Sequence, residues 1–330
     1  MPKENQLGFG DGLLAKRKKV SRLYRHLQQL DALIDWKPLL AKIRAIDKTG
    51  TKRGGRPRKN ARWMLKAIFL QHLFSLSDPQ LEDQLIDRLS FQRFTGIGLD
   101  EEIPDFTTFW RFKEALAAHH LDEQLFTLVT RQLEAQGLLV KKGTMVDATI
   151  IRSANRPLSD QKRSALKDKP SAQIDTQARS TCKGGQYYFG YKGHIGVDIG
   201  SKLIRRLAFT PANVHDSKLT RRLISYDEHA LFGDKAYANT HLKRCARVFG
   251  WFYGVLEKAR RGQGLSITQH KRNKQLSRVR ASVEHPFAWL KTKAGLHCMR
   301  AKSEARNRLR FTLSCIGWNL NRAQYLLKKA

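Results

Sequence analysis

The stretch Met145-Val146-Asp147-Ala148-Thr149-Ile150-Ile151 places one carboxylate inside an apolar run. Its length and its β-branched residues predict a buried strand. A carboxylate in these surroundings is costly unless it is paired or bound to a metal. Asp147 is therefore a candidate functional residue, with a structural hydrogen bond at a strand end as the alternative.

Two more carboxylates occupy settings that complement the first. Asp234 ends the apolar run 230–234, and Glu284 lies on a predicted helix four residues after Arg280. Two aspartates from strands and a glutamate from a helix, if they converge, would bind a divalent cation through oxygen, as Mg²⁺ requires. We therefore expect Asp147, Asp234 and Glu284 to be both catalytic and metal-binding, with Mg²⁺ or Mn²⁺ as the cofactor.

Each of these residues also has a plainer interpretation. Asp234 could be a turn residue, and Glu284 could form a surface ion pair with Arg280, which contributes little to stability. Asp198, on a neighbouring predicted strand, is the main competitor for a place in the site. We interpret Asp198 as a structural partner.

The charge of the chain indicates the kind of partner. The 330 residues include 62 Lys and Arg against 29 Asp and Glu, a formal net charge of +33. This excess favours a polyanion, with DNA or RNA ahead of a membrane surface. An acidic metal site inside such a basic protein suggests an enzyme that cuts or joins nucleic acid.

Other features of the sequence favour a reducing cytoplasm. No apolar run reaches the ~18 residues of a membrane span, and the N-terminus lacks the apolar region of a signal peptide. The four cysteines are scattered and form no CxxC pair. We therefore expect neither a disulfide framework nor a zinc site.

The pattern of elements predicts an α/β protein. Helical periodicity dominates before residue 138, and strands alternate with helices afterwards. The polar stretch Arg152–Thr181 is expected to be a mobile loop. The expected regions are a basic N-terminal segment that contacts DNA (1–60), a helical domain for DNA binding or scaffolding (61–138), a catalytic α/β domain (139–295) and a C-terminal helix packing on the core (296–330).

The end of the basic segment predicts direct DNA contacts. Arg53, Arg56, Arg58 and Lys59 alternate with Gly and Pro, so this part is expected to be extended rather than helical. An extended Arg-Pro-Arg segment can lie in a minor groove and meet phosphates on both sides. A solvated basic linker is the alternative.

Several short motifs occur in a fixed order. In the N-terminal half these are Met64-Leu65-Lys66-Ala67-Ile68-Phe69-Leu70-Gln71-His72 and Ile103-Pro104-Asp105-Phe106-Thr107-Thr108. In the C-terminal half they are Val146-Asp147-Ala148-Thr149, Phe189-Gly190-Tyr191-Lys192-Gly193-His194, Gly233-Asp234-Lys235-Ala236-Tyr237, and the spaced set Arg280, Glu284 and Lys291.

This ordered set resembles the DDE transposases of bacterial insertion sequences, and within them the IS5-like branch of the IS4/IS5 superfamily. The resemblance covers roughly residues 55–325, whereas residues 1–50 match no motif of the family. It implies an RNase-H-like core: a mixed five-stranded sheet with Asp147 on the first strand, Asp234 after the fourth and Glu284 on a later helix. One departure is Ser277, where the superfamily often has a Tyr.

The same resemblance and the helical spacing suggest further DNA contacts. Lys192 and His194 are expected to touch phosphates. On one continuous helix, Arg280, Glu284 and Lys291 would project from one side, so that Arg280 and Lys291 clamp phosphates beside the bond that is cut. Pro286 complicates this arrangement, because it cannot donate to the helix ladder.

The sequence thus favours a transposase that performs metal-dependent cleavage and strand transfer at the ends of its own insertion sequence. Its expected partners are double-stranded DNA, as terminal inverted repeats and as target, and a second copy of the chain in a synaptic homodimer. No membrane partner is expected, and the resemblance implies a location in the bacterial cytoplasm, in association with the nucleoid. The alternatives are a DNA-binding protein with an inactive RNase-H-like scaffold and a metal-dependent nuclease.

Overall fold

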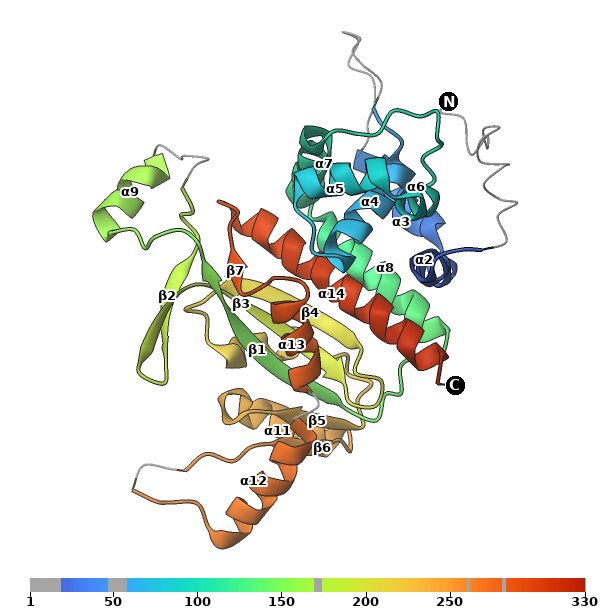
Figure 1. Cartoon of the computed structure of the whole chain (residues 1–330). Helices are drawn as coiled ribbons and strands as arrows, with labels where there is room; N and C mark the ends of the chain where they lie inside the picture. Colours follow the sequence, from blue (N-terminus) through green and yellow to red (C-terminus); the bar gives the residue numbers. More distant parts are fainter. Residues whose placement is uncertain (1–18, 47–57, 169–173, 260–261, 281–282, 330) are drawn as a thin grey trace. The chain divides into compact units, whose positions relative to one another are not determined.

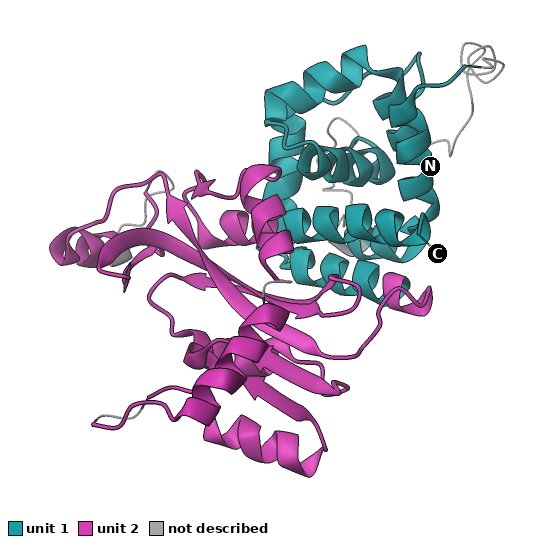
Figure 2. Cartoon of the chain, turned by 60° about the horizontal axis from the view of Figure 1, so that its bottom comes forward, with its two compact units in different colours: residues 1–132, 312–330 teal, residues 133–311 magenta. Residues whose placement is uncertain are grey.

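The computed structural model of the protein describes residues 19–46, 58–168, 174–259, 262–280 and 283–329. The chain divides into two compact units (Figure 2), one comprising 1–132 and 312–330 and the other 133–311. Within the described ranges, no helix is long and apolar enough to cross a membrane.

The first unit is built from helices in its described part (Figure 1). They are α2 (Arg22–Ala32), α3 (Trp36–Ile46), α4 (Ala61–Leu73), α5 (Asp78–Asp87), α6 (Leu89–Thr95), α7 (Phe106–Ala118), α8 (Leu121–Ala135) and the later part of α14 (Glu304–Leu327). Asp105 caps α7 by accepting a hydrogen bond from the Thr108 amide at 2.7 Å. Helix α4 is buried from Met64 to Gln71, which fits its apolar sequence.

This unit differs from the expected regions at both of its ends. The basic segment 1–60 contains α2 and α3, whose Leu27, Leu30 and Leu39 are buried. Residues 312–330, expected to pack on the catalytic core, group with the helical unit. The basic composition of this segment did not indicate α2. A helix needs only one apolar stripe to pack against its neighbours, and its other faces can carry charge.

The second unit is centred on a mixed sheet. Its strands are β1 (Thr144–Ser153), β2 (Arg179–Lys183), β3 (Gln186–Asp198), β4 (Ile204–Pro211), β5 (Ala230–Gly233), β6 (Phe252–Val255) and β7 (Cys298–Met299). In the described part of the chain they form one seven-stranded sheet. Five of the strands follow one another in the order β2-β3-β1-β5-β6, and in addition β4 pairs with β3 and β7 pairs with β1. Strand β3 is antiparallel to β1, whereas β5 is parallel to it.

Helices complete this unit. Leu223 of α10 (Thr220–Leu223) and Leu242 of α11 (Thr240–Val248) join a buried cluster with Val146 and Leu231 from the sheet. The remaining helices are α9 (Asp160–Asp168), α12 (Ile267–Arg280) and α13 (Glu284–Thr292).

The prediction of a mobile loop over Arg152–Thr181 is wrong for most of its described part. Strand β1 continues to Ser153, and the stretch also contains α9 and the first residues of β2. Its polar composition reflects exposure, because α9 and the β2–β3 hairpin bury few of their side chains. A hairpin needs backbone pairing rather than an apolar sequence, so hydropathy alone missed it.

Gly193 is required by close packing against a helix. A Cβ built at this position in β3 would lie 2.4 Å from a ring carbon of Phe311, near the start of α14. Phe311 is fully buried and packs on Phe209 with ring centroids 5.6 Å apart, so it has little room to move.

We expect Gly193→Ala to lower the free energy of unfolding by about 1–3 kcal/mol, because overpacking forces a shift of the ring or the strand. Urea unfolding measures this change. Gly264→Ala is the matched control, since its Cβ would meet nothing within 4 Å. A Gly193→Ala variant as stable as the control would contradict this account of the packing.

Candidate active site

Asp147 and Asp234 lie side by side because of the strand register. Strands β1 and β5 run parallel with Val146 opposite Gly233, so Asp147 is the next residue of β1 and Asp234 is the first residue after β5. Asp147 accepts a hydrogen bond from the Ala148 amide at 2.8 Å, and Asp234 accepts one from the Lys235 amide at 2.6 Å. The two carboxylates that the sequence singled out on strands are therefore neighbours.

Arg280 links these two carboxylates. It is the last residue of α12, and its guanidinium lies 3.4 Å from Asp147 Oδ2 and 3.7 Å from Asp234 Oδ1. All three side chains are partly buried, with 22–37% of each exposed. A cation between two half-buried carboxylates reduces their mutual repulsion.

Burial raises the pKa of Asp147 above its ordinary value. The Ala148 amide and the Arg280 guanidinium act in the opposite direction, and the nearby Asp234 adds to the increase. A nearby positive charge therefore stabilises the ionised form of Asp147.

Glu284 is not part of this cluster. It is exposed at the first position of α13, and α12 ends four residues earlier, at Arg280. Pro286 lies in the first turn of α13, where no backbone donor is needed. Among the described residues, no three His, Cys, Asp or Glu side chains are grouped to hold a metal.

Tyr237 is a site neighbour to which the sequence gave no role. Its side chain is 1% exposed, and its hydroxyl has no hydrogen-bond partner within the described structure. Burial raises its pKa, with further contributions from Asp216, Asp147 and Asp234. Its position three residues after Asp234 in the Gly233–Tyr237 motif was the available signal.

Lys192 and His194 are held by protein groups instead of facing outward. Lys192 donates to the Val214 carbonyl at 2.9 Å and pairs with Asp216 at 3.0 Å. His194 is fully buried, with Nε2 3.0 Å from the Thr210 hydroxyl. The burial of His194 disagrees with the predicted phosphate contact, because both faces of its strand are covered.

Asp198 is a structural partner, as predicted. Its carboxylate accepts hydrogen bonds from the amides of Val140, Lys141 and Ser201 and from the Ser201 hydroxyl. It thereby fixes the turn after β3 to the segment that leads into β1. A carboxylate satisfied by four donors is not available for a metal.

The remaining predicted DNA contacts that the structure describes belong to both units. Lys291, on α13, is exposed and lines a cavity beside β1. In the helical unit, Arg58 is exposed and Lys59 forms an ion pair with Glu102 at 2.8 Å. Arg53 and Arg56 lie outside the described residues.

Two family models match this chain. The transposase DDE domain matches residues 139–320, more than half of the chain, and the transposase domain DUF772 matches residues 15–115. The chain therefore belongs to the DDE transposases. The second match includes most of the segment for which the sequence offered no motif.

A solved structure is also similar to this chain. It is a piggyBac transposase in a synaptic complex with hairpin DNA, solved by cryo-electron microscopy. The match covers 94% of this chain and 77% of that one, at 9% identity and a TM-score of 0.43.

Buried His194 makes stability depend on pH. Burial lowers its pKa to about 4, with Lys192 acting in the same direction and Asp216 opposing. As pH falls below about 6.5, the unfolded chain binds a proton that the folded chain does not bind until about pH 4. Stability contributed by neutral His194 is therefore lost on acidification.

We expect wild type to lose about 2 kcal/mol of unfolding free energy through this group between pH 7 and pH 5. Urea unfolding at both pH values, compared with His194→Gln, isolates the contribution. The variant should have the shallower pH dependence, whatever its stability at pH 7. Parallel curves would mean that His194 titrates normally.

Proposed function

We propose that this transposase cleaves DNA at the ends of an insertion sequence of the IS5-like branch and joins the freed ends to target DNA, in a reaction that needs Mg²⁺ or Mn²⁺. The observation that carries the proposal is the pair Asp147, within β1, and Asp234, directly after the parallel strand β5, which share one guanidinium. The net charge of +33 supports a nucleic-acid substrate.

The strand order supports an RNase-H-like core. Strands β4, β3, β1, β5 and β6 follow one another across the sheet, with β3 and β4 forming an antiparallel pair and β5 and β6 running parallel to β1. This order is compatible with the five-stranded mixed sheet that the family resemblance implies. Strands β2 and β7 are short additions at the far ends of β3 and β1.

The two aspartates fit a divalent cation. They offer hard carboxylate oxygens, and the guanidinium between them marks a place that already attracts positive charge. When bound, such an ion lowers the pKa of a water nucleophile and stabilises the oxygen that leaves. Glu284 would add the third carboxylate from the start of α13, four residues after Arg280.

The remaining groups near the site would hold the substrate. Arg280 can donate to a phosphate as well as to the two carboxylates, since a guanidinium carries five N–H donors. Lys291 lies two turns beyond Glu284 on α13 and would neutralise a neighbouring phosphate. In this scheme Asp147 and Asp234 make the contacts to the ion, and the cationic residues position the strand.

We further propose that duplex terminal repeats and target DNA are the substrates, that two copies act together as a homodimer, and that the reaction takes place in the bacterial cytoplasm. An inactive DNA-binding scaffold would bind the ends without cutting them. A metal-dependent nuclease acting on RNA would cut without end specificity. Incubation with Mg²⁺ and DNA that carries the ends of the encoding element separates the three.

We expect Asp147→Asn and Asp234→Asn each to reduce end cleavage by at least about a hundredfold, because the amide keeps the shape but cannot hold the ion by charge. DNA binding, measured by fluorescence anisotropy, should persist. Asp160→Asn, at an exposed position on α9, is the control. Normal cleavage by either variant would remove these residues from the site.

The proposed phosphate contacts of the basic segment are tested by salt dependence. Replacing Arg53, Arg56 and Arg58 together by Ala should reduce the slope of log K against log salt by roughly 0.9 for each phosphate that the variant no longer neutralises. This change leaves α2 and α3 intact, unlike deletion of residues 1–60. An unchanged slope would identify these arginines as solvated charges.

A further inference from the structure

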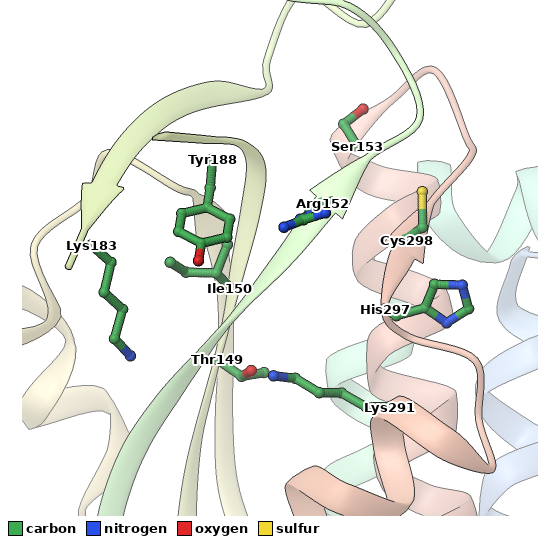
Figure 3. Close-up of a pocket in the computed structure, with 9 residues that line it drawn as sticks. All are labelled: Thr149, Ile150, Arg152, Ser153, Lys183, Tyr188, Lys291, His297 and Cys298. Atoms are coloured by element: carbon green, nitrogen blue, oxygen red, sulfur yellow. The ribbon is translucent and has the colours of Figure 1, made fainter. Parts of the chain in front are cut away.

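A cavity of about 650 Å³ lies along β1, beyond the aspartate pair. Figure 3 shows Lys291 of α13 extending toward Thr149 of β1, with Tyr188 and Lys183 on the other side of the strand's ribbon. The described lining consists of Thr149, Ile150, Arg152, Ser153, Lys183, Tyr188, Lys291, His297 and Cys298.

The lining has a one-sided charge. Arg152, Lys183 and Lys291 come from β1, β2 and α13, and none of the described lining residues is acidic. Within the described part of the chain, none of these three cations pairs with a carboxylate. Side chains from separate elements that bring like charges to one cavity repel one another, and an anion relieves that repulsion.

The cavity also offers a flat surface. The Arg152 guanidinium lies 5.3 Å from the centre of the Tyr188 ring, and the Tyr188 hydroxyl is fixed by a 2.8 Å hydrogen bond to Gln186. Aromatic rings and guanidinium planes both stack on nucleic-acid bases, without a strong preference for sequence. Cations and a fixed ring in one cavity together match a nucleotide better than a simple anion.

The size of the cavity selects an unpaired strand. Its volume falls within the range of about 300–1,000 Å³ that is typical of small-molecule sites. A duplex is too wide for such a space, whereas one nucleotide with its flanking phosphates fits.

The cavity adjoins the aspartate pair. Asp147 and Thr149 point to the same side of β1 and are about 7 Å apart along the strand. A DNA strand that passes Asp147 therefore needs little length to reach Thr149 and Lys291. Arg152, which is paired with Gly190, and Tyr188 project from the opposite face, so the DNA strand reaches them around the edge of β1, which the cavity spans.

We propose that this cavity binds the single-stranded continuation of the DNA strand that passes the two aspartates. Lys183 and Lys291 hold its phosphates, and a base lies against the Tyr188–Arg152 pair. The assignment rests on the proposed function for where the strand is cut, but the binding itself needs no catalysis.

Two cysteines provide a direct test. Cys298 lines the cavity, whereas Cys182 is paired with Tyr187 in the β2–β3 hairpin and so lies on the opposite face from Lys183 and Tyr188. We expect a ten-residue oligothymidylate to slow alkylation of Cys298 at least about fivefold and to leave Cys182 unchanged, as read by mass spectrometry of the full-length protein after digestion. A duplex of the same length should protect Cys298 less.

Equal alkylation of Cys298 with and without the single strand would overturn the proposal, even if the oligonucleotide binds elsewhere on this basic protein. Variants add a second measurement. In Tyr188→Ala, the oligonucleotide concentration that gives half-maximal protection of Cys298 should rise about tenfold, because no ring remains to stack on a base. Tyr188→Phe should retain it, since the ring remains.

Matched controls lie close by. Tyr187→Ala removes the neighbouring ring, which is 84% exposed on the other face of the hairpin. Lys243→Ala, on α11, is compared with Lys183→Ala. We expect both controls to behave as wild type and Lys183→Ala to weaken protection. Weakening in the controls as great as in Tyr188→Ala and Lys183→Ala would overturn the assignment of the cavity.

The same preparation distinguishes this proposal from the proposed function. End cleavage by wild type without protection of Cys298 removes the cavity assignment alone. Protection of Cys298 by the single strand without any Mg²⁺-dependent cleavage supports the cavity and removes the catalytic proposal.

Discussion

The contact on which the candidate site depends is the one that Arg280 makes with Asp147 and Asp234 at the same time. The parallel register of β1 and β5 forces the two carboxylates together, and burial raises the pKa of Asp147. Without a nearby cation, such a pair would favour protonation of one member. The guanidinium therefore stabilises the charged form of the site in the absence of any other positive group.

This contact also ties the site to the helices that follow. Arg280 ends α12, and Glu284 begins α13 four residues later. A divalent cation between Asp147 and Asp234 would compete with the guanidinium for the same oxygens. Displacement of the Arg280 guanidinium would release the end of α12 from the two aspartates. It would thereby affect the start of α13, where Glu284 lies. Glu284, the third predicted carboxylate, thus belongs to a different helix from the arginine that contacts the pair.

The sequence predicted the part of this site that depends on strands. An aspartate within or directly after an apolar run indicates a strand with a candidate functional residue. Parallel pairing of two such strands then places the two aspartates side by side. It predicted the helical part less well, because the spacing argument placed Arg280 and Glu284 on one helix, whereas they belong to α12 and α13. Pro286 was the local signal, because proline is compatible with the first turn of a helix. Polar composition likewise concealed α9 and β2, whose structure depends on backbone pairing.

Lys192 and His194 show why a polar residue on a strand beside the aspartate pair need not face solvent. Both lie on β3, which is paired on one edge with β1 and on the other with β4. Lys192 contacts Asp216 and Val214, and His194 contacts Thr210 of β4. Burial raises the pKa of Tyr237, and the negative charges of Asp216, Asp147 and Asp234 raise it further. These residues thus form a buried polar layer behind the aspartates. A central strand surrounded by other strands can carry such a layer because its neighbours supply partners for polar atoms such as Lys192 Nζ and His194 Nε2. Sequence alternation alone cannot distinguish that arrangement from a solvent-facing one.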